Sequence, residues 1–172
     1  MKNIIFKYGS FAAITICILF FLGLLGENLS YSIREVIGYS SMIVSLLFIF
    51  FGIKQYRDKE NKGILTLNKA LLIGIFISLI AATAFGIIDM IYITYINPDF
   101  MTEYYTHAVE QMRLSLSETE FKVQLMELEK QKELFMNPFF NFLVMFVTVM
   151  MIGCIISLIS GFILQRKPTT YN

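Results

Sequence analysis

Apolar residues gather in four long runs, and the segments between the runs carry nearly all of the charge. The runs are residues 8–26, 36–53, 70–96 and 138–164, and the only Asp, Glu, Lys or Arg within them is Asp89. A helix rises 1.5 Å per residue, so roughly 20 apolar residues cross the ~30 Å hydrocarbon layer. Lipid cannot satisfy an exposed backbone amide. The pattern therefore predicts an all-α membrane protein with four transmembrane helices.

Composition supports the same class. Hydrophobic residues make up 56% of the 172-residue chain and charged residues only 16%, whereas soluble domains carry about 25% charge. Four crossings leave no room for a large soluble domain, so we expect a single integral membrane domain over residues 1–172 whose surroundings are membrane lipids. The net charge of +1 gives no indication of a nucleic-acid partner.

The first run differs from a cleaved signal peptide. Lys2 and Lys7 form a basic start, but the apolar run exceeds the usual 7–15 residues and no A-x-A-like site follows it. We favour a retained helix. Cys17 and Cys154 lie inside apolar runs and are expected to act as small hydrophobic residues. A disulfide between them would need the two residues at one depth on adjacent helices.

The distribution of basic residues predicts the orientation. Nine Lys and Arg residues precede the first run, lie in the second loop or follow the fourth run, and five lie in the other two loops. The positive-inside rule then places both termini and the second loop in the cytoplasm. An even number of crossings also requires the two termini to share a side. The basic second loop could in addition bind anionic lipid, although topology already accounts for it.

Two of the runs carry small residues at every fourth position. A step of four keeps them on one helix face, where they allow the backbones of two helices to approach closely. We therefore expect these faces to pack against other helices, against each other or against a second copy. The third run contributes Gly74, Ser78, Ala82 and Gly86, and the fourth contributes Gly153, Ser157 and Gly161.

The third loop, residues 99–136, is predicted to be helical. Asn97-Pro98 ends the third run and Asn137-Pro138 opens the fourth, with Asn137 as a natural N-cap. One helix is expected from Asp99 to about Leu114. Ser117 and Glu120 match a capping box, so a second helix should run to about Phe135.

The second of the two helices predicted in the third loop carries one apolar stripe. This stripe needs to be covered, because an isolated helix of this length is marginal in water. The stripe comprises Phe121, Leu125, Leu128 and Phe135. It could lie on the bilayer, pack on the protein, or bind a partner or a second copy through residues 99–136. Eight acidic residues against four basic ones between Asp99 and Glu133 disfavour anionic lipid. We therefore favour packing on the protein or on a partner.

The loop and helix patterns resemble a bacterial four-span family, domain of unknown function 4199. Similar segments are Gly52–Asp58 through Gly63 to Lys69-Ala70 and Gly74, Asn97–Met101, Asn137-Pro138 and Ile152–Leu164. A Ser-Pro pair would be expected where this chain has Asn137-Pro138, and both residue types cap helices well. The resemblance covers nearly the whole chain and implies a bacterial cytoplasmic-membrane location. It brings no activity, cofactor or functional residue.

Asp89 is the one candidate for an intramembrane functional acid. An acidic side chain at mid-bilayer costs about 2.5–3.5 kcal/mol on insertion scales. If Lys69 lies at one interface, Asp89 lies ~30 Å away at the other, where an acid is cheap. We favour this interfacial location over a buried one.

A second candidate cluster lies in the loop, where Glu103, His107 and Glu110 would share one helix face. Such a face could bind a divalent metal, but it could equally be a solvated surface. We therefore predict no metal site and no cofactor, and we find no phosphate loop, nucleophile elbow or paired-cysteine motif.

These observations favour a non-catalytic interaction or assembly component that acts through its outward-facing helical loop. A small transporter or channel subunit that uses Asp89 is the alternative. A membrane enzyme ranks third, because the spans offer few convergent polar residues.

Overall fold

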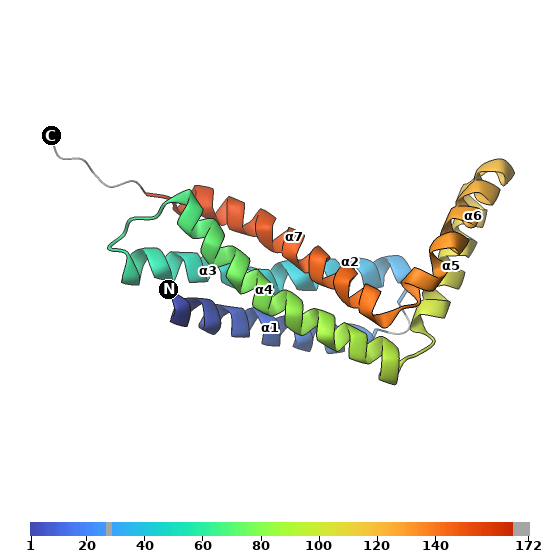
Figure 1. The fold of residues 1–172 in the computed structure, drawn as a ribbon, viewed down its shortest axis with the longest axis horizontal. Helices are drawn as coiled ribbons and strands as arrows, with labels where there is room; N and C mark the ends of the chain where they lie inside the picture. The colour runs from blue at the N-terminus through green and yellow to red at the C-terminus, as the bar shows by residue number, and fades with distance from the viewer. Residues whose placement is uncertain (27–28, 167–172) are drawn as a thin grey trace. The chain divides into compact units, whose positions relative to one another are not determined.

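The computed structural model describes residues 1–26 and 29–166, and in that part of the chain every regular element is a helix. Figure 1 shows the helices in chain order. They are α1 (Lys2–Leu24), α2 (Tyr31–Leu46), α3 (Phe48–Gln55), the π-helical turn η1 (Tyr56–Glu60), α4 (Leu67–Ile91), the π-helical turn η2 (Tyr92–Ile96), α5 (Phe100–Ser115), α6 (Glu118–Phe135) and α7 (Pro138–Leu164). The predicted all-α class is confirmed.

Four stretches of helix in the described residues are long and apolar enough to cross a membrane: Lys2–Leu24, Ser32–Glu60, Leu67–Ile96 and Pro138–Leu164. The second joins α2, α3 and η1, and the third joins α4 and η2. The first covers residues 8–24 of the predicted span 8–26, the second and third contain the predicted spans 36–53 and 70–96, and the fourth has the predicted bounds, 138–164. The first three helical stretches begin before the apolar runs, because charged and polar residues also form helix at the end of a span.

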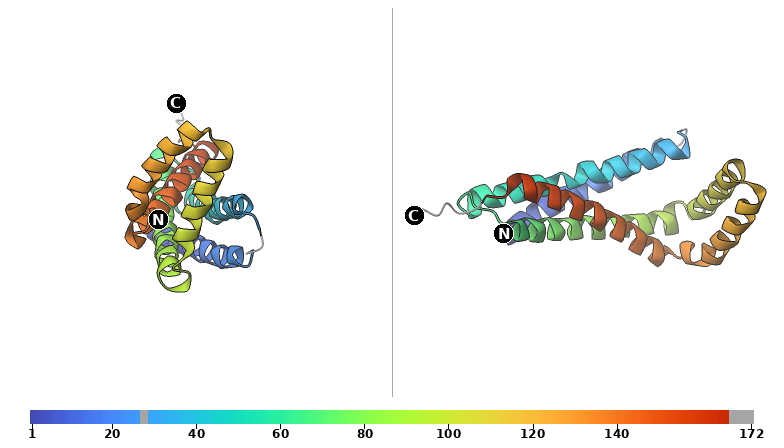
Figure 2. Two further views of the ribbon diagram at one scale, coloured as in Figure 1. Left: turned by 90° about the vertical axis from the view of Figure 1, so that its right-hand side faces the viewer. Right: turned by 90° about the horizontal axis from the view of Figure 1, so that it is seen from above.

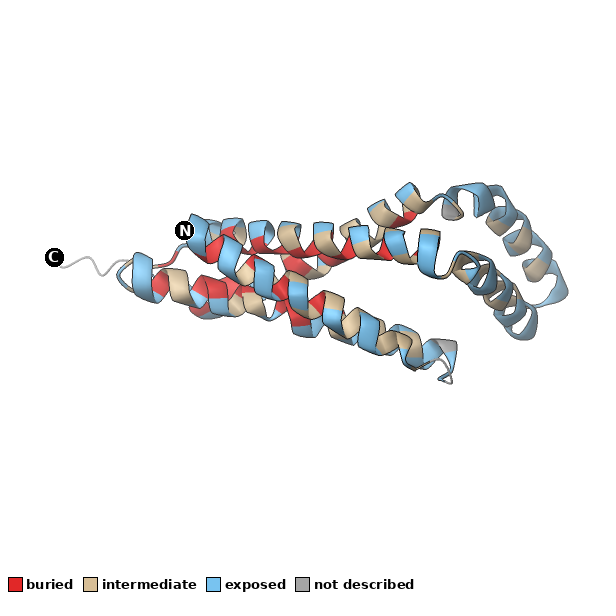
Figure 3. Ribbon diagram, turned by 90° about the horizontal axis from the view of Figure 1, so that it is seen from below, coloured by how far each residue is buried: buried red, intermediate tan, exposed pale blue. Residues whose placement is uncertain are grey.

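The chain divides into two compact units. Unit 1 contains Met1–Phe85 and Phe146–Asn172, and unit 2 contains Gly86–Met145. Within unit 1, α1 packs on α2 and α3. Its fully buried side chains are mostly branched aliphatic residues such as Ile16, Ile49, Ile77 and Val149. Figure 3 shows buried segments, in red, on the sides of the helices that face neighbouring helices.

At one end of unit 1 the N-terminus, the second loop and the end of α7 meet. The Met1 amino group pairs with Glu60, and the Tyr8 hydroxyl donates to the Gln55 side chain at 2.8 Å. Leu65 and Arg166 form an isolated antiparallel bridge, with backbone N–O distances of 3.0 and 2.9 Å. The turn before this bridge requires positive φ at Gly63, with φ 81°. The first residue of the chain and the end of its last helix therefore share one end of unit 1.

Unit 2 is dominated by the hairpin of α5 and α6, which lie side by side in both views of Figure 2. Before the hairpin, η2 closes with the Asn97 amide donating to the Tyr92 carbonyl at 2.9 Å. After it, the Asn137 side-chain oxygen accepts from the Phe139 amide at 2.9 Å. Asn137 thus caps α7, with Pro138 in the first turn, where its missing N–H costs nothing.

Candidate functional site

The two small-residue faces meet in unit 1 as a reciprocal pair of contacts. A Cβ built on Gly74 would contact the side chain of Ser157, with 2.6 Å to its Cβ, and a Cβ on Gly153 would lie 2.6 Å from the Cβ of Ser78. Each serine hydroxyl donates to the glycine carbonyl four residues earlier in its own helix, at 2.8 and 2.6 Å. We call Gly74, Ser78, Gly153 and Ser157 the glycine–serine seam. Both hydroxyl protons are used within their own helices, and the close approach of the two backbones indicates a packing role.

The other small residues of these faces extend the same contact. Ala82 is completely buried. A Cβ on Gly161 would meet the side chains of Leu67 and Ala70 at 2.7 and 3.2 Å. In unit 2, a Cβ on Gly86 would meet Phe142 at 2.8 Å. All seven predicted positions are therefore buried or closely packed.

Asp89 is buried within the protein, with 7% of its surface exposed. It lies one turn beyond Gly86 on α4, and Asn141, which is 5% exposed, precedes Phe142 on the facing helix α7. In the described part of unit 2, no hydrogen bond or ion pair reaches the Asp89 carboxylate. Burial of a charged Asp89 carboxylate therefore costs more free energy than a carboxylate exposed to water at the membrane interface would.

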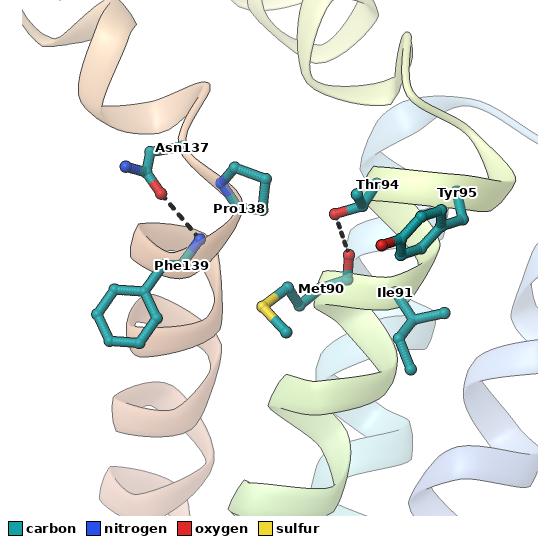
Figure 4. Close-up of a pocket in the computed structure, with 7 residues that line it drawn as sticks. All are labelled: Met90, Ile91, Thr94, Tyr95, Asn137, Pro138 and Phe139. Carbon is teal, nitrogen blue, oxygen red and sulfur yellow. Dashed lines mark hydrogen bonds between the residues drawn. The ribbon is translucent and has the colours of Figure 1, made fainter.

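An open cavity of about 360 Å³ lies in unit 2, between the end of α4 with η2 and the start of α7. Figure 4 shows Met90, Thr94, Asn137 and Phe139 among its lining residues. The Thr94 hydroxyl donates to the Met90 carbonyl at 2.6 Å, and the Asn137 oxygen is occupied as the α7 cap. The lining is mainly apolar, and Tyr95 adds a further hydroxyl to it.

Glu103, His107 and Glu110 lie along α5. Both glutamates are exposed, and His107 is half-buried. In residues 1–26 and 29–166, no group of three or more His, Cys, Asp or Glu side chains is arranged to hold a metal ion. Cys17 and Cys154 are both free thiols.

The predicted apolar stripe of α6 lies at the hairpin interface. Phe121, Leu125 and Leu128 are half-buried, whereas every other described side chain of α6 is exposed. The ammonium group of Lys132 lies 4.7 Å from the centre of the Tyr105 ring on α5, in the same interface. The side chain of Phe135, also predicted for the stripe, lies outside the described residues. The stripe is thus at least partly covered by the protein's own α5.

The predicted capping box is present at the start of α6. The Glu120 amide donates to the Ser117 hydroxyl oxygen, and the Ser117 amide donates back to the Glu120 carboxylate at 3.2 Å. The bonds from Ser117 hold the pKa of the Glu120 carboxyl below its usual range. Because the pKa of Glu120 is lower in the folded protein, its bonds with Ser117 stabilise the fold at pH values above the pKa of an unfolded glutamate. This stabilisation is lost as the pH falls through the pKa of Glu120 in the folded protein.

Two features were missed from sequence. The first is an outer face on α6, opposite the half-buried stripe, formed by Val123, Met126 and Leu134. These side chains are 57%, 59% and 49% exposed, respectively. Their spacing of three and eight residues is helical, but Lys130 interrupts it as Lys132 interrupts the predicted stripe, so spacing alone does not decide which side is exposed.

The second missed feature is Arg57, which is 8% exposed at the end of unit 1 where the N-terminus and the end of α7 meet. Its guanidinium pairs with Asp58 at 2.7 Å and donates to the Leu164 carbonyl at 3.3 Å. A juxtamembrane arginine is explained by the positive-inside rule alone, so no local signal distinguishes it from its neighbours.

Comparison with known families gives a match over residues 7–166 to the family described as "Protein of unknown function (DUF4199)". The chain belongs to this family. The resemblance is confirmed, and the match covers α1 from residue 7, the other three stretches able to cross a membrane, and the whole α5–α6 hairpin. Comparisons with curated proteins and with solved structures found no match.

For this DUF4199 protein the matched residues include the glycine–serine seam, Asp89 and the outer face of α6. The four stretches of helix that are long and apolar enough to cross a membrane indicate a multi-pass membrane protein. The description of DUF4199 carries no activity, so any function has to be argued from these side chains themselves.

Proposed function

We propose that this DUF4199 protein is a non-catalytic component of the bacterial cytoplasmic membrane whose α5–α6 hairpin binds a protein partner outside the cytoplasm. The observation that carries the proposal is the outer face of α6, where Val123, Met126 and Leu134 are each about half exposed or more. Full burial of such a side chain stabilises a contact by roughly 1.5–3 kcal/mol. Apolar side chains grouped on one helix face outside the lipid mark interaction surfaces.

We place the proposed interaction face on the side of α6 opposite the predicted stripe. Phe121, Leu125 and Leu128 are partly covered at the hairpin interface, so they hold the hairpin together. The side of α6 that points away from α5 remains for a partner. A contact there needs no opening of the hairpin.

The proposed orientation rests on charge and on chain connectivity. The N-terminus, the second loop and the end of α7 meet at one end of unit 1, where Lys54, Lys59 and Arg166 also lie. One membrane-spanning stretch, Leu67–Ile96, separates that loop from the hairpin. If the basic end faces the cytoplasm, as the positive-inside rule requires, the hairpin faces the opposite compartment.

A photo-crosslinking amino acid at Val123 tests the proposal in intact cells. We expect an adduct of one discrete mass with another protein, which disappears when Met126→Ser is added, because the same apolar contact is lost. The matched control is the crosslinker at Leu125, which faces α5 and should give no intermolecular adduct. Adducts to lipid or within the chain alone from Val123 would rule out a protein partner at this face.

A second candidate function uses Asp89, because this acid is buried with no hydrogen-bond or ion-pair partner in the described part of unit 2. Acids within membrane spans are functional candidates by default, since keeping one there is costly. On this alternative the chain is a small transporter or channel subunit in which Asp89 carries a proton.

Proton flux into vesicles that contain the purified protein tests this alternative. Asp89→Asn should abolish a pH-linked flux without changing expression, because the amide keeps the shape but cannot bind a proton reversibly. Asp99→Asn, which removes an exposed acid at the start of α5, should leave the flux unchanged. A wild-type protein that shows no flux, or an Asp89→Asn variant with full flux, would exclude it.

A further inference from the structure

The outer face of α6 is bordered by acidic side chains. Glu120 precedes Val123 by three residues and Glu127 follows it by four, so both are its neighbours on the helix surface. Glu133 follows Met126 by seven residues, two turns along the same side. All three glutamates are exposed. Lys130 is the single positive charge within this face.

Two of these glutamates can form ion pairs with a partner. In the described chain the only ion pair within α6 joins Lys122 to Glu118, and Glu127 and Glu133 have no ion-pair partner. Glu120 already bonds to Ser117 in the cap. The surface therefore presents an apolar centre with uncompensated negative charge beside it.

This charge distinguishes between the surfaces that could cover the face. Residues 99–133 carry eight acidic and four basic side chains, so a second copy of the hairpin would bring like charges together. An anionic bilayer surface would be repelled for the same reason. A segment with Lys or Arg beside its own apolar residues would be attracted, and it would approach faster at low ionic strength.

The helical spacing of the apolar residues specifies the shape of the matching segment. Val123, Met126 and Leu134, with Lys130, follow steps of three, four and four residues, which is the spacing of side chains that pack against another helix. We infer that the partner presents a basic amphipathic helix, whose apolar stripe packs on Val123, Met126 and Leu134 while its Lys or Arg side chains pair with Glu127 and Glu133. This inference rests on the proposed function and identifies the chemical class of the partner.

Two synthetic peptides test the inference against the full-length protein in nanodiscs of phosphatidylcholine. Both are fluorescent amphipathic helices with the same leucine stripe, one flanked by lysines and the other by glutamates. Fluorescence anisotropy should show the basic peptide binding at least about tenfold more tightly than the acidic one, because complementary charge favours one and like charge opposes the other. Its affinity should fall as salt is raised, since the contact is at the surface.

Charge-neutral variants test which glutamates attract the basic peptide. Glu127→Gln with Glu133→Gln should lower the affinity for the basic peptide by about fivefold or more, since two surface charge pairs are lost. Glu103→Gln with Glu110→Gln removes the same charge from exposed positions of α5 and should change the affinity less than about twofold. Equal binding of the two peptides, or equal losses in the two double variants, would overturn the inference.

The outcomes also separate this inference from the proposed function. If the Val123 crosslinker captures a protein partner but the basic peptide does not bind, the interaction face stands and the basic partner is wrong. If the basic peptide binds in the predicted way and Val123→Ser with Met126→Ser leaves that binding unchanged, charge alone attracts it and the helix-packing inference fails.

Discussion

Gly153→Leu is expected to prevent α4 and α7 from packing in unit 1. A Cβ at this position would lie 2.6 Å from the Cβ of Ser78, which is itself completely buried. Neither atom is the far end of a flexible side chain, so the helices themselves have to separate. Overpacking a core costs typically about 1–3 kcal/mol, and a leucine here should reach or exceed the upper end. Unfolding in mixed detergent micelles, followed by circular dichroism, measures the loss.

Gly38→Leu is the matched control, because it makes the same change in a membrane helix where a Cβ would meet nothing within 4 Å. It should leave stability unchanged or slightly raised, since leucine favours helix over glycine. A further variant exchanges the pair, with Gly153→Ser and Ser78→Gly. Its stability should be closer to that of the wild type than the stability of Gly153→Leu is. Equal losses from Gly153→Leu and Gly38→Leu would show that the glycine–serine seam does not hold these helices together.

Arg57→Ala is expected to loosen the end of unit 1 where the N-terminus and the end of α7 meet. The guanidinium is buried and donates to the Leu164 carbonyl, one of the last four of α7, which have no partner within their own helix. A buried carbonyl left without its donor costs about 1–3 kcal/mol. Limited proteolysis in detergent should cut near the end of α7 sooner in this variant than in the wild type.

Lys59→Ala is the control for Arg57→Ala, because it removes an exposed positive charge from the same turn. It should leave both stability and the cleavage rate unchanged. Arg57→Lys should fall between the two, since an ammonium group cannot reproduce the forked contacts to Asp58 and Leu164. Identical behaviour of the Arg57→Ala and Lys59→Ala variants would contradict a structural role for Arg57.

The fold could be predicted from the sequence because its main determinants are local. Nearly all residues of an apolar run contribute to the same helix, so the four runs remain visible whatever packs on them. The ends of the loop helices are also local, since Ser117 with Glu120 and Asn137 with Pro138 place the capping groups within three residues of each other. The spacing of four between small residues likewise indicated which faces of the third and fourth runs pack closely.

The remaining features depend on residues far apart in the chain. Arg57 contacts Leu164 across 107 positions, and Leu65 pairs with Arg166, so nothing near either residue reveals the contact. The two apolar sides of α6 look alike from composition, and only the position of α5 decides which one is covered. The burial of Asp89 also depends on its surroundings, because the same side chain would be cheap if water reached it.

Labelling of single cysteines with a membrane-impermeant maleimide tests the proposed topology most directly. In a chain with Cys17→Ala and Cys154→Ala, one cysteine replaces Val123 in the hairpin or Lys59 in the second loop. A chain that crosses four times with its basic end in the cytoplasm predicts labelling of the Val123 site in cells whose cytoplasmic membrane is intact. The Lys59 site should react only after that membrane is opened. Labelling of both sites from the same compartment would contradict the four-crossing arrangement.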